Sequence, residues 1–251
     1  MKKKTFLTYE QPLLTCMVQA NNPARIKELI DVSIPEGAEA FGMQFCKLET
    51  EYRNKDIYKD LFSYTNLPVY VTNYRDHRSN VGKTDDMLAT ELVEIAECGA
   101  TLCDVMGDYF DACDCELTMT NEAVNKQMKL INELHEKGAE VLMSSHVRKF
   151  IPAKSVLEIA LEHQKRGADI CKIVTGAANM AEQIENLRII NLLKENLKIP
   201  FLFLSGGECR IMRHIGATLG NCMSLCVHEY DEYATKTQPV LRNFKVLRDV
   251  F

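Results

Sequence analysis

Residues 140–176 contain two apolar segments, EVLMSSH (140–146) and ADICKIVTG (168–176), joined by PAKSVLEIALEHQKRG (152–167). Each flanking segment is a short, largely apolar run, which is typical of a strand buried on both faces of a parallel sheet. The joining segment has a proline at its start and "KRG" at its end, which are start and stop signals of a helix. The stretch therefore predicts a strand–helix–strand unit, with His146 and Lys172 as reactive side chains in its two strands.

The same alternation extends along the chain. Further strands are predicted at 13–19, 38–45, 68–74, 102–108, 200–207 and 221–227, and further helices at 84–99, 120–138 and 180–197. Eight strand–helix units in about 250 residues favour a single TIM (β/α)8 barrel domain over residues 1–251. A doubly wound open sheet is the alternative. It usually has fewer strands and a glycine-rich first turn, and the sequence contains no GxGxxG or Walker motif.

Charge and apolar patterning exclude several classes of protein. The formal net charge is −5, which gives no reason to expect a nucleic-acid or membrane partner, so any anion site must be a local basic pocket. No apolar run reaches the length of a membrane span. Near the start of the chain, Glu10, Gln11 and Pro12 interrupt the apolar core that a signal peptide would need.

The cysteines indicate the compartment. The chain has ten cysteines and no CxxC pair, and most lie inside apolar runs, so they are expected to be reduced in a cytoplasmic protein. The segment DACDCE (111–116) could bind a soft metal ion. A solvated acidic loop is favoured, because no second Cys/His cluster occurs at ligand spacing.

His146 and Lys172 suggest covalent chemistry. The carboxyl ends of barrel strands form the active-site face, and neighbouring strands lie about 4.8 Å apart, so the two side chains can meet at the barrel mouth. Burial disfavours the charged form of a lysine, and a neutral amine can form an imine with a carbonyl compound. A histidine beside it suits proton transfer. The structural alternatives are a lysine paired with Asp104 or Asp169 and a hydrogen-bonded core histidine.

Further polar residues follow the last predicted strands. GGECRIMR (206–213) brings Arg210 and Arg213 near a helix start, where guanidinium groups could bind a carboxylate in bidentate fashion. Gln238 follows strand eight and could contact a hydroxyl or carboxylate. For each arginine taken singly, a solvated surface residue is the favoured interpretation. The polar segment 74–84, with Gly82, is a lid candidate.

Four ordered motifs resemble those of the type I, Schiff-base 3-dehydroquinate dehydratase family. MSSHVRKFIP resembles the family segment with the catalytic histidine, and GADICKIVT the segment with the imine-forming lysine. MRHIGATLGN resembles the segment with a substrate-binding arginine, which matches Arg213. ATKTQPV resembles the last loop, whose glutamine matches Gln238. The resemblance is clearest from about 138 to 240.

The N-terminal half departs from this pattern. On strand two, Gly42, Gln44 and Cys46 stand at the family's polar positions. At the end of strand three, Tyr74 stands at an arginine position, or Arg75 if the strand slips by one residue. Three further positions differ: Arg78 or Ser79 replaces the glutamate that orients the histidine, Met106 replaces a strand-four glutamate, and Ala234 replaces a serine.

The resemblance implies a hydro-lyase of the shikimate pathway, which leads to aromatic amino acids. Lys172 would form an imine with 3-dehydroquinate, His146 would move protons, and 3-dehydroshikimate would be released without a metal or cofactor. Arg213 and Gln238 would hold the substrate, helped by Gln44 and Arg75, while Asp104 and Arg210 would support the site. These eight residues are the predicted site.

Two other functions stay open. A class I aldolase or dehydratase acting on another hydroxy-keto acid would keep Lys172 and His146 and change strands two and three. A degenerate, non-catalytic barrel is less expected, because burying an unused lysine is costly. The resemblance also implies a homodimer.

Overall fold

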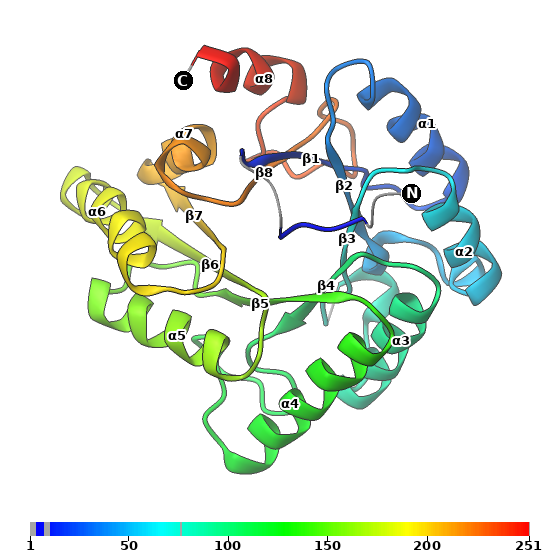
Figure 1. The fold of residues 1–251 in the computed structure, drawn as a ribbon, viewed down its shortest axis with the longest axis horizontal. Helices are drawn as coiled ribbons and strands as arrows, with labels where there is room; N and C mark the ends of the chain where they lie inside the picture. The colour runs from blue at the N-terminus through cyan, green and yellow to red at the C-terminus, as the bar shows by residue number, and fades with distance from the viewer. Residues whose placement is uncertain (1–3, 8–10, 76, 251) are drawn as a thin grey trace.

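Eight parallel strands form the centre of the molecule, and helices surround them (Figure 1). The structure is a computed structural model, and it describes residues 4–7, 11–75 and 77–250. The strands are β1 (Leu13–Met17), β2 (Ala40–Gln44), β3 (Val69–Thr72), β4 (Leu102–Met106), β5 (Glu140–His146), β6 (Ile170–Ala177), β7 (Phe201–Gly207) and β8 (Met223–Cys226). The prediction of a TIM barrel is confirmed, because the strands neighbour one another in sequence order and the first strand, β1, also pairs with the last, β8, whereas a doubly wound open sheet reverses its strand order.

A helix follows each strand. The helices are α1 (Pro23–Ser33), α2 (Lys55–Ser63), α3 (Asp85–Glu97), α4 (Asn121–Glu136), α5 (Ala153–Lys165), α6 (Met180–Asn196), α7 (Met212–Leu219) and α8 (Leu241–Val250). Short 3₁₀ turns lie at Phe45–Lys47, Thr50–Tyr52, Arg78–Asn80 and Glu208–Ile211. Polar side chains cap four helix starts by accepting a hydrogen bond from a backbone N–H of the first turn; these caps are Asn22, Asn54, Thr84 and Asn179.

The barrel closes between β7 and β8 through a side chain. Asn221 accepts a hydrogen bond from the backbone N–H of Phe203 at 2.8 Å and donates to the carbonyl of the same residue at 3.0 Å. The backbone N–H of Cys222 donates to the carbonyl of Phe201. One asparagine thus supplies the donor and acceptor that a neighbouring strand would otherwise provide.

The strand period of two places the site residues in the barrel interior. Leu102, Leu142 and Ile170 belong to the apolar cluster inside the barrel. The residues two positions further along these strands, Asp104, Ser144 and Lys172, share their inward face but lie nearer the carboxyl ends. Two further residues along β5 comes His146. An apolar layer therefore fills the bottom of the barrel, and a polar layer opens above it.

Within the described ranges, no helix has both the length and the apolar character needed to cross a bilayer. All ten cysteines are free thiols. Seven of them are buried, as the apolar runs around them predict, whereas Cys113 and Cys115 are exposed in the loop after β4.

Candidate active site

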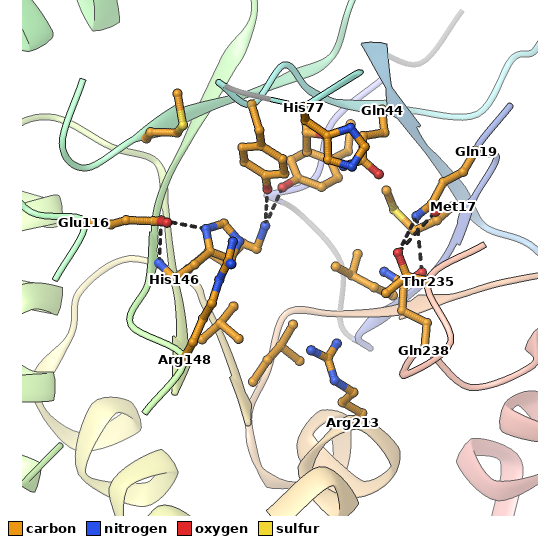
Figure 2. Close-up of a pocket in the computed structure, with 18 of the residues that line it drawn as sticks. Met17, Gln19, Gln44, His77, Glu116, His146, Arg148, Arg213, Thr235 and Gln238 are labelled. Carbon is orange, nitrogen blue, oxygen red and sulfur yellow. Dashed lines mark hydrogen bonds and ion pairs between the residues drawn. The ribbon is translucent and has the colours of Figure 1, made fainter. Parts of the chain in front are cut away.

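A cavity of about 580 Å³ opens at the carboxyl ends of the strands. Figure 2 shows it with side chains converging from the strand ends and the loops that follow them. Its walls are formed by Met17, Gln19, Gln44, Tyr70, Thr72, Tyr74, Arg75, His77, Met106, Glu116, His146, Arg148, Lys172, Val174, Leu204, Arg213, Leu225, Thr235 and Gln238. Lys172 and His146 thus share one cavity at the barrel mouth.

Lys172 is enclosed by oxygen atoms. Its amine donates to the hydroxyl of Tyr74 at 2.6 Å, to the hydroxyl of Tyr70 at 3.0 Å and to Asp104 Oδ2 at 3.2 Å. Both tyrosine hydroxyls in turn donate to the same carboxylate oxygen of Asp104. Ser144 donates to the other oxygen, so this buried carboxylate is fully engaged. Of the two carboxylates named as possible partners of Lys172, the structure selects Asp104.

The charge distribution around Lys172 follows from these contacts. Burial by itself raises the pKa of Asp104, but the positive charges of Lys172 and His146 and the donated hydrogen bonds outweigh it, and the pKa lies below its ordinary value. Burial and the charge of Asp104 raise the pKa of Tyr70 and of Tyr74 well above the ordinary value. Asp104 is therefore ionised near neutral pH, and both phenols keep their protons.

Glu116 orients His146. One carboxylate oxygen of Glu116 accepts a hydrogen bond from His146 Nδ1 at 2.8 Å and another from the His146 backbone N–H at 2.6 Å. In Figure 2 the imidazole lies between Glu116 and the interior of the cavity. Burial raises the pKa of Glu116, yet the contacts with His146 and the charge of Arg148 bring it below the ordinary value. Because Nδ1–H is held by a carboxylate, Nε2 is the nitrogen left to exchange protons in the cavity.

The loop after β4 needs a glycine to bring Glu116 into place. A Cβ at Gly107 would lie 2.4 Å from the carbonyl oxygen of Glu116 and 2.9 Å from Ser145 Oγ. Ser145 donates to that same carbonyl at 2.6 Å. Glu116 itself has a φ of 45°, in the left-handed region that non-glycine residues rarely adopt. The backbone geometry of this loop is therefore tied to the position of the carboxylate.

Arg213 faces the cavity without a protein partner. No hydrogen bond or ion pair joins its guanidinium to another residue in the described part of the chain, and its Nε is buried. Burial lowers the pKa of this arginine. A desolvated guanidinium without a counter-ion is arranged to receive an anion, and a carboxylate matches it in bidentate geometry.

Gln238 belongs to a network beside Arg213. Gln19 donates to Gln238 Oε1 at 3.5 Å and to Thr235 Oγ1 at 3.2 Å. Behind this network, Lys47 donates to Gln19 Oε1 and to the carbonyl of Tyr233. Lys47 does not line the cavity, although it is buried and burial lowers its pKa to about 8. Lys47 is therefore a buried lysine with a lowered pKa that lies behind the residues lining the cavity.

Of the remaining predicted residues, two line the cavity and one lies outside it. Gln44 lines the cavity, and so does Arg75, but Arg75 is held by ion pairs with Asp85 at 2.8 Å and Asp108 at 3.0 Å. Arg210 lies outside the cavity and is exposed, because it sits on the 3₁₀ turn after β7, one helical turn before Arg213.

Asp104 does not contact the imidazole of His146, since its oxygens are taken by Lys172, Ser144 and two tyrosines. The contacts of Asp104 therefore fit support of Lys172, and they do not fit orientation of His146. The orienting position is taken by Glu116 instead.

The strand-two departure has a steric reason. A Cβ at Gly42 would lie 2.1 Å from the sulfur of Met17, which fills the space on the inward face of β2. A larger polar side chain at this position requires that Met17 move. Met17 therefore occupies the space that a side chain at position 42 would need.

The sequence reasoning missed Glu116, Tyr70 and Tyr74 as members of the site. Glu116 lies in the segment predicted to be an acidic solvated loop, Tyr70 lies within the predicted strand 68–74, and Tyr74 stands at a position where the family has an arginine. The position of this loop after a barrel strand is a signal, because such loops form the active-site rim, but it does not single out Glu116. Among the described residues, no group of three or more His, Cys, Asp or Glu side chains is placed to hold a metal ion, DACDCE included. The lid candidate 74–84 contains Asp76, which lies outside the described residues.

Comparison with known proteins agrees with the motifs. Among curated proteins, the 3-dehydroquinate dehydratase of Alkaliphilus oremlandii is 32% identical over 114 residues, and the match spans 44% of this chain and 44% of that relative, less than half of either. A type I 3-dehydroquinate dehydratase from Clostridium difficile, solved with covalent modified comenic acid, superposes with a TM-score of 0.81 at 17% identity, over 100% of this chain and 97% of that one.

The 3-dehydroquinate dehydratase of Geobacillus kaustophilus gives a TM-score of 0.82 at 12% identity, over 99% of this chain and 95% of that one. At these low identities the two structures establish the shared fold. A family model described as type I 3-dehydroquinase matches residues 42–245, which is most of the chain. The resemblance seen in the four motifs is thereby confirmed, and the chain belongs to the type I 3-dehydroquinase family.

Proposed function

We propose that the protein dehydrates 3-dehydroquinate to 3-dehydroshikimate through an imine on Lys172. The observation that carries this proposal is the position of Lys172 and His146 on one cavity, with a separate carboxylate holding each. Membership of the family and the covalent modified comenic acid in the Clostridium difficile relative both support it.

The reaction begins at the substrate ketone. The charged amine of Lys172 first gives one proton to the imidazole of His146. The neutral amine then attacks the carbonyl carbon, a carbinolamine forms, and loss of water, with that proton returned by the imidazolium, leaves an imine that withdraws electrons from the adjacent carbon. Asp104 contributes electrostatically and does not react itself. It lies 3.2 Å from the amine and stabilises the positive charge that nitrogen carries as the iminium ion.

His146 transfers the protons of the elimination. Its Nε2 removes the proton from the carbon next to the imine, and the imidazolium returns a proton to the β-hydroxyl, which leaves as water. Glu116 holds Nδ1–H throughout, so the ring keeps one tautomer and one orientation. Hydrolysis of the imine then releases the unsaturated ketone and regenerates Lys172.

Arg213 binds the substrate carboxylate, and Gln238 assists it. The guanidinium has no anionic partner among the residues that the structure describes, whereas every other buried cation on this cavity has one. A monocarboxylate would complete its coordination. Gln44 lies on the β2 side and offers an amide to a ring hydroxyl.

A different hydroxy-keto acid is the second candidate. It is favoured by the contacts on strand three, where Arg75 is held by two carboxylates and Tyr74 donates to Asp104 instead of presenting a free cation. A site with fewer groups for ring hydroxyls discriminates less strongly among keto acids. A class I aldolase or dehydratase reaction on such a compound would use the same lysine and histidine.

The test is turnover of 3-dehydroquinate, followed by the absorbance of the conjugated ketone, beside a panel of other hydroxy-keto acids. The proposal predicts saturable turnover that is lost in Lys172→Ala. Turnover of another keto acid without turnover of 3-dehydroquinate would support the second candidate. Absence of turnover and of covalent adduct with every compound would indicate a non-catalytic barrel and contradict both.

We also propose a cytoplasmic location and a homodimer as finer expectations. Ten free cysteines, two of them exposed, are typical of a reducing compartment. The dimer rests on the family resemblance. Sedimentation equilibrium of the purified chain tests it, with a single species of about 57 kDa, twice the 28.5 kDa chain mass, as the expected result.

A further inference from the structure

Tyr70 and Tyr74 each connect Lys172 to Asp104 through the same pattern of hydrogen bonds. Each hydroxyl accepts a hydrogen bond from the lysine amine and donates its own hydrogen to Asp104. A proton on the amine therefore has a hydrogen-bonded route through a phenol oxygen. Buried polar groups of this kind are costly unless each hydrogen bond is made, and here each is made.

The surroundings of the two phenols differ. Tyr70 is fully buried, and its ring packs with the apolar cluster inside the barrel. Tyr74 is partly exposed and follows the end of β3, and its ring meets the imidazole of His146 edge to face, with ring centroids 5.1 Å apart. Its hydroxyl is also the nearer of the two to the amine, at 2.6 Å against 3.0 Å. Tyr74 therefore lies between the two groups assigned to the reaction.

We propose that Tyr74 is a third catalytic residue, whose hydroxyl relays a proton between the nitrogen of Lys172 and the substrate oxygen while the carbinolamine forms and breaks down. This inference rests on the proposed imine chemistry of Lys172. Tyr70 holds the amine in place and does not take part in the relay.

The relay balances in atoms and charge. When the amine attacks, the C–N bond forms and the carbonyl π pair moves to oxygen, which leaves nitrogen positive and oxygen negative. Tyr74 turns its hydroxyl hydrogen from Asp104 to the oxygen, gives this proton to the oxygen and receives one from the nitrogen, so the phenol is restored and a neutral carbinolamine results. Direct transfer from nitrogen to oxygen would need a small, strained ring, and an intervening hydroxyl relieves that strain.

The next step uses His146. The nitrogen lone pair forms the C=N bond, the C–O bond breaks, and the hydroxyl leaves as water with a proton from the imidazolium. Imine hydrolysis follows the same path in reverse, with Tyr74 returning the proton from oxygen to nitrogen. Because burial raises the pKa of Tyr74, its hydroxyl remains protonated at working pH and is available as a relay in each turnover.

The position of Tyr74 also bears on specificity. The family pattern has an arginine at the end of strand three, where Tyr74 or Arg75 stands here, and of these two it is Tyr74 that contacts Lys172. The change removes a cation from the substrate-binding wall and adds a proton relay beside the amine. The two effects are separable, because the first alters substrate affinity and the second alters the rate of imine formation.

The experiment compares Tyr74→Phe with Tyr70→Phe in the full-length protein. Each variant is mixed with 3-dehydroquinate, or with the best keto acid of the panel, and quenched with borohydride at increasing times, and the covalent adduct is measured by mass spectrometry. The proposal predicts that imine formation slows about 100-fold in Tyr74→Phe and less than about tenfold in Tyr70→Phe, with KM changed little.

A second readout separates a relay from a structural role. Added buffer acids should accelerate imine formation in Tyr74→Phe in proportion to their concentration, because they replace the missing relay, and should leave the wild type unaffected. If Tyr74→Phe does not fold, 3-fluorotyrosine placed at position 74 keeps the hydroxyl and lowers its pKa, and should change the rate of imine formation measurably.

The outcomes distinguish the two proposals. Equal loss in both tyrosine variants, or no loss and no buffer effect in Tyr74→Phe, would overturn the relay while a wild-type adduct upheld the imine chemistry. A wild-type protein that forms no adduct with any keto acid would overturn the proposed function and the relay together.

Discussion

Lys172 and Arg213 both line the cavity, and their contacts with the rest of the protein are opposite in kind. Lys172 is held by a carboxylate and two hydroxyls, whereas Arg213 has no partner among the described residues. Figure 2 shows Arg213 across the cavity from His146. The difference corresponds to two different functions in the site. A group that makes and breaks bonds must be held by the protein, while a group that binds substrate charge is left free for it.

Lys172→Met should have the largest effect of any single change. Turnover should fall at least about 10⁴-fold, because no other side chain lining the cavity can form the imine. The free energy of unfolding should fall by about 3–5 kcal/mol, since Asp104 is left buried without its counter-ion. Urea unfolding measures the second effect. The double variant Lys172→Met/Asp104→Asn should regain much of the lost stability, and no regain would argue against the pair as the cause.

Arg213→Met should behave in the opposite way. The unfolding free energy should stay constant or rise, because the change removes a desolvated charge that no described residue neutralises. KM should rise roughly 30-fold or more, as expected for losing one partner of a buried charge pair worth about 2 kcal/mol or more. Arg210→Gln is the matched control, since this exposed arginine lies outside the cavity. Equal effects of the two substitutions on KM would contradict the assignment of Arg213 to substrate binding.

Glu116→Gln should have a smaller effect on turnover. The amide can still accept a hydrogen bond from His146 Nδ1, but it no longer supplies the charge that stabilises the imidazolium, so kcat should fall about tenfold. KM should stay near the wild-type value. Steady-state kinetics measures both constants, with Glu122→Gln on the exposed start of α4 as the control. A change in KM alone would assign Glu116 to substrate binding.

His163 is a buried titratable residue outside the cavity, so a change there should affect stability and not turnover. It is buried between Ser145 and Cys171, and burial lowers its pKa to about 3, with the charge of Arg166 adding to the effect. Between about pH 6.5 and pH 3, His163 is protonated in the unfolded chain but stays neutral in the native state. Stability should therefore fall as pH falls from about 6.5 to about 3, by about 1.4 kcal/mol per pH unit for this group.

The measurement is urea unfolding at several pH values in wild type and His163→Gln. The variant should show a shallower decline over this range and near-normal turnover at neutral pH. An unchanged slope would mean that His163 does not carry the acid sensitivity.

The barrel and the reacting pair could be predicted from sequence because they depend on local periodicity. Each of the eight strands is a short apolar run, and a period of two places Lys172 on the face of Ile170. Glu116 could not be predicted, because its role depends on a left-handed backbone and on the close approach that Gly107 permits. Nothing in DACDCE marks which acid turns inward.

Strand three shows a second limit. Tyr74 and Arg75 are neighbours in sequence and both line the cavity, and a slip of one residue would exchange their contacts. In the structure Tyr74 accepts a hydrogen bond from Lys172, whereas Arg75 forms ion pairs with Asp85 and Asp108. These partners lie ten or more residues away in the sequence, so local sequence does not determine the contacts. Tyr70 likewise has the sequence context of a core residue, and only the fold brings it to Lys172.

The most direct test of the central claim is to locate the covalent adduct. The protein is incubated with 3-dehydroquinate, reduced with borohydride, digested and sequenced by tandem mass spectrometry. The structure predicts one adduct, on Lys172, because its amine lines the cavity beside His146. Lys47 is the stringent alternative, since its pKa is lowered to about 8 but its amine lies behind Gln19. An adduct on Lys47, or none at all, would contradict the account.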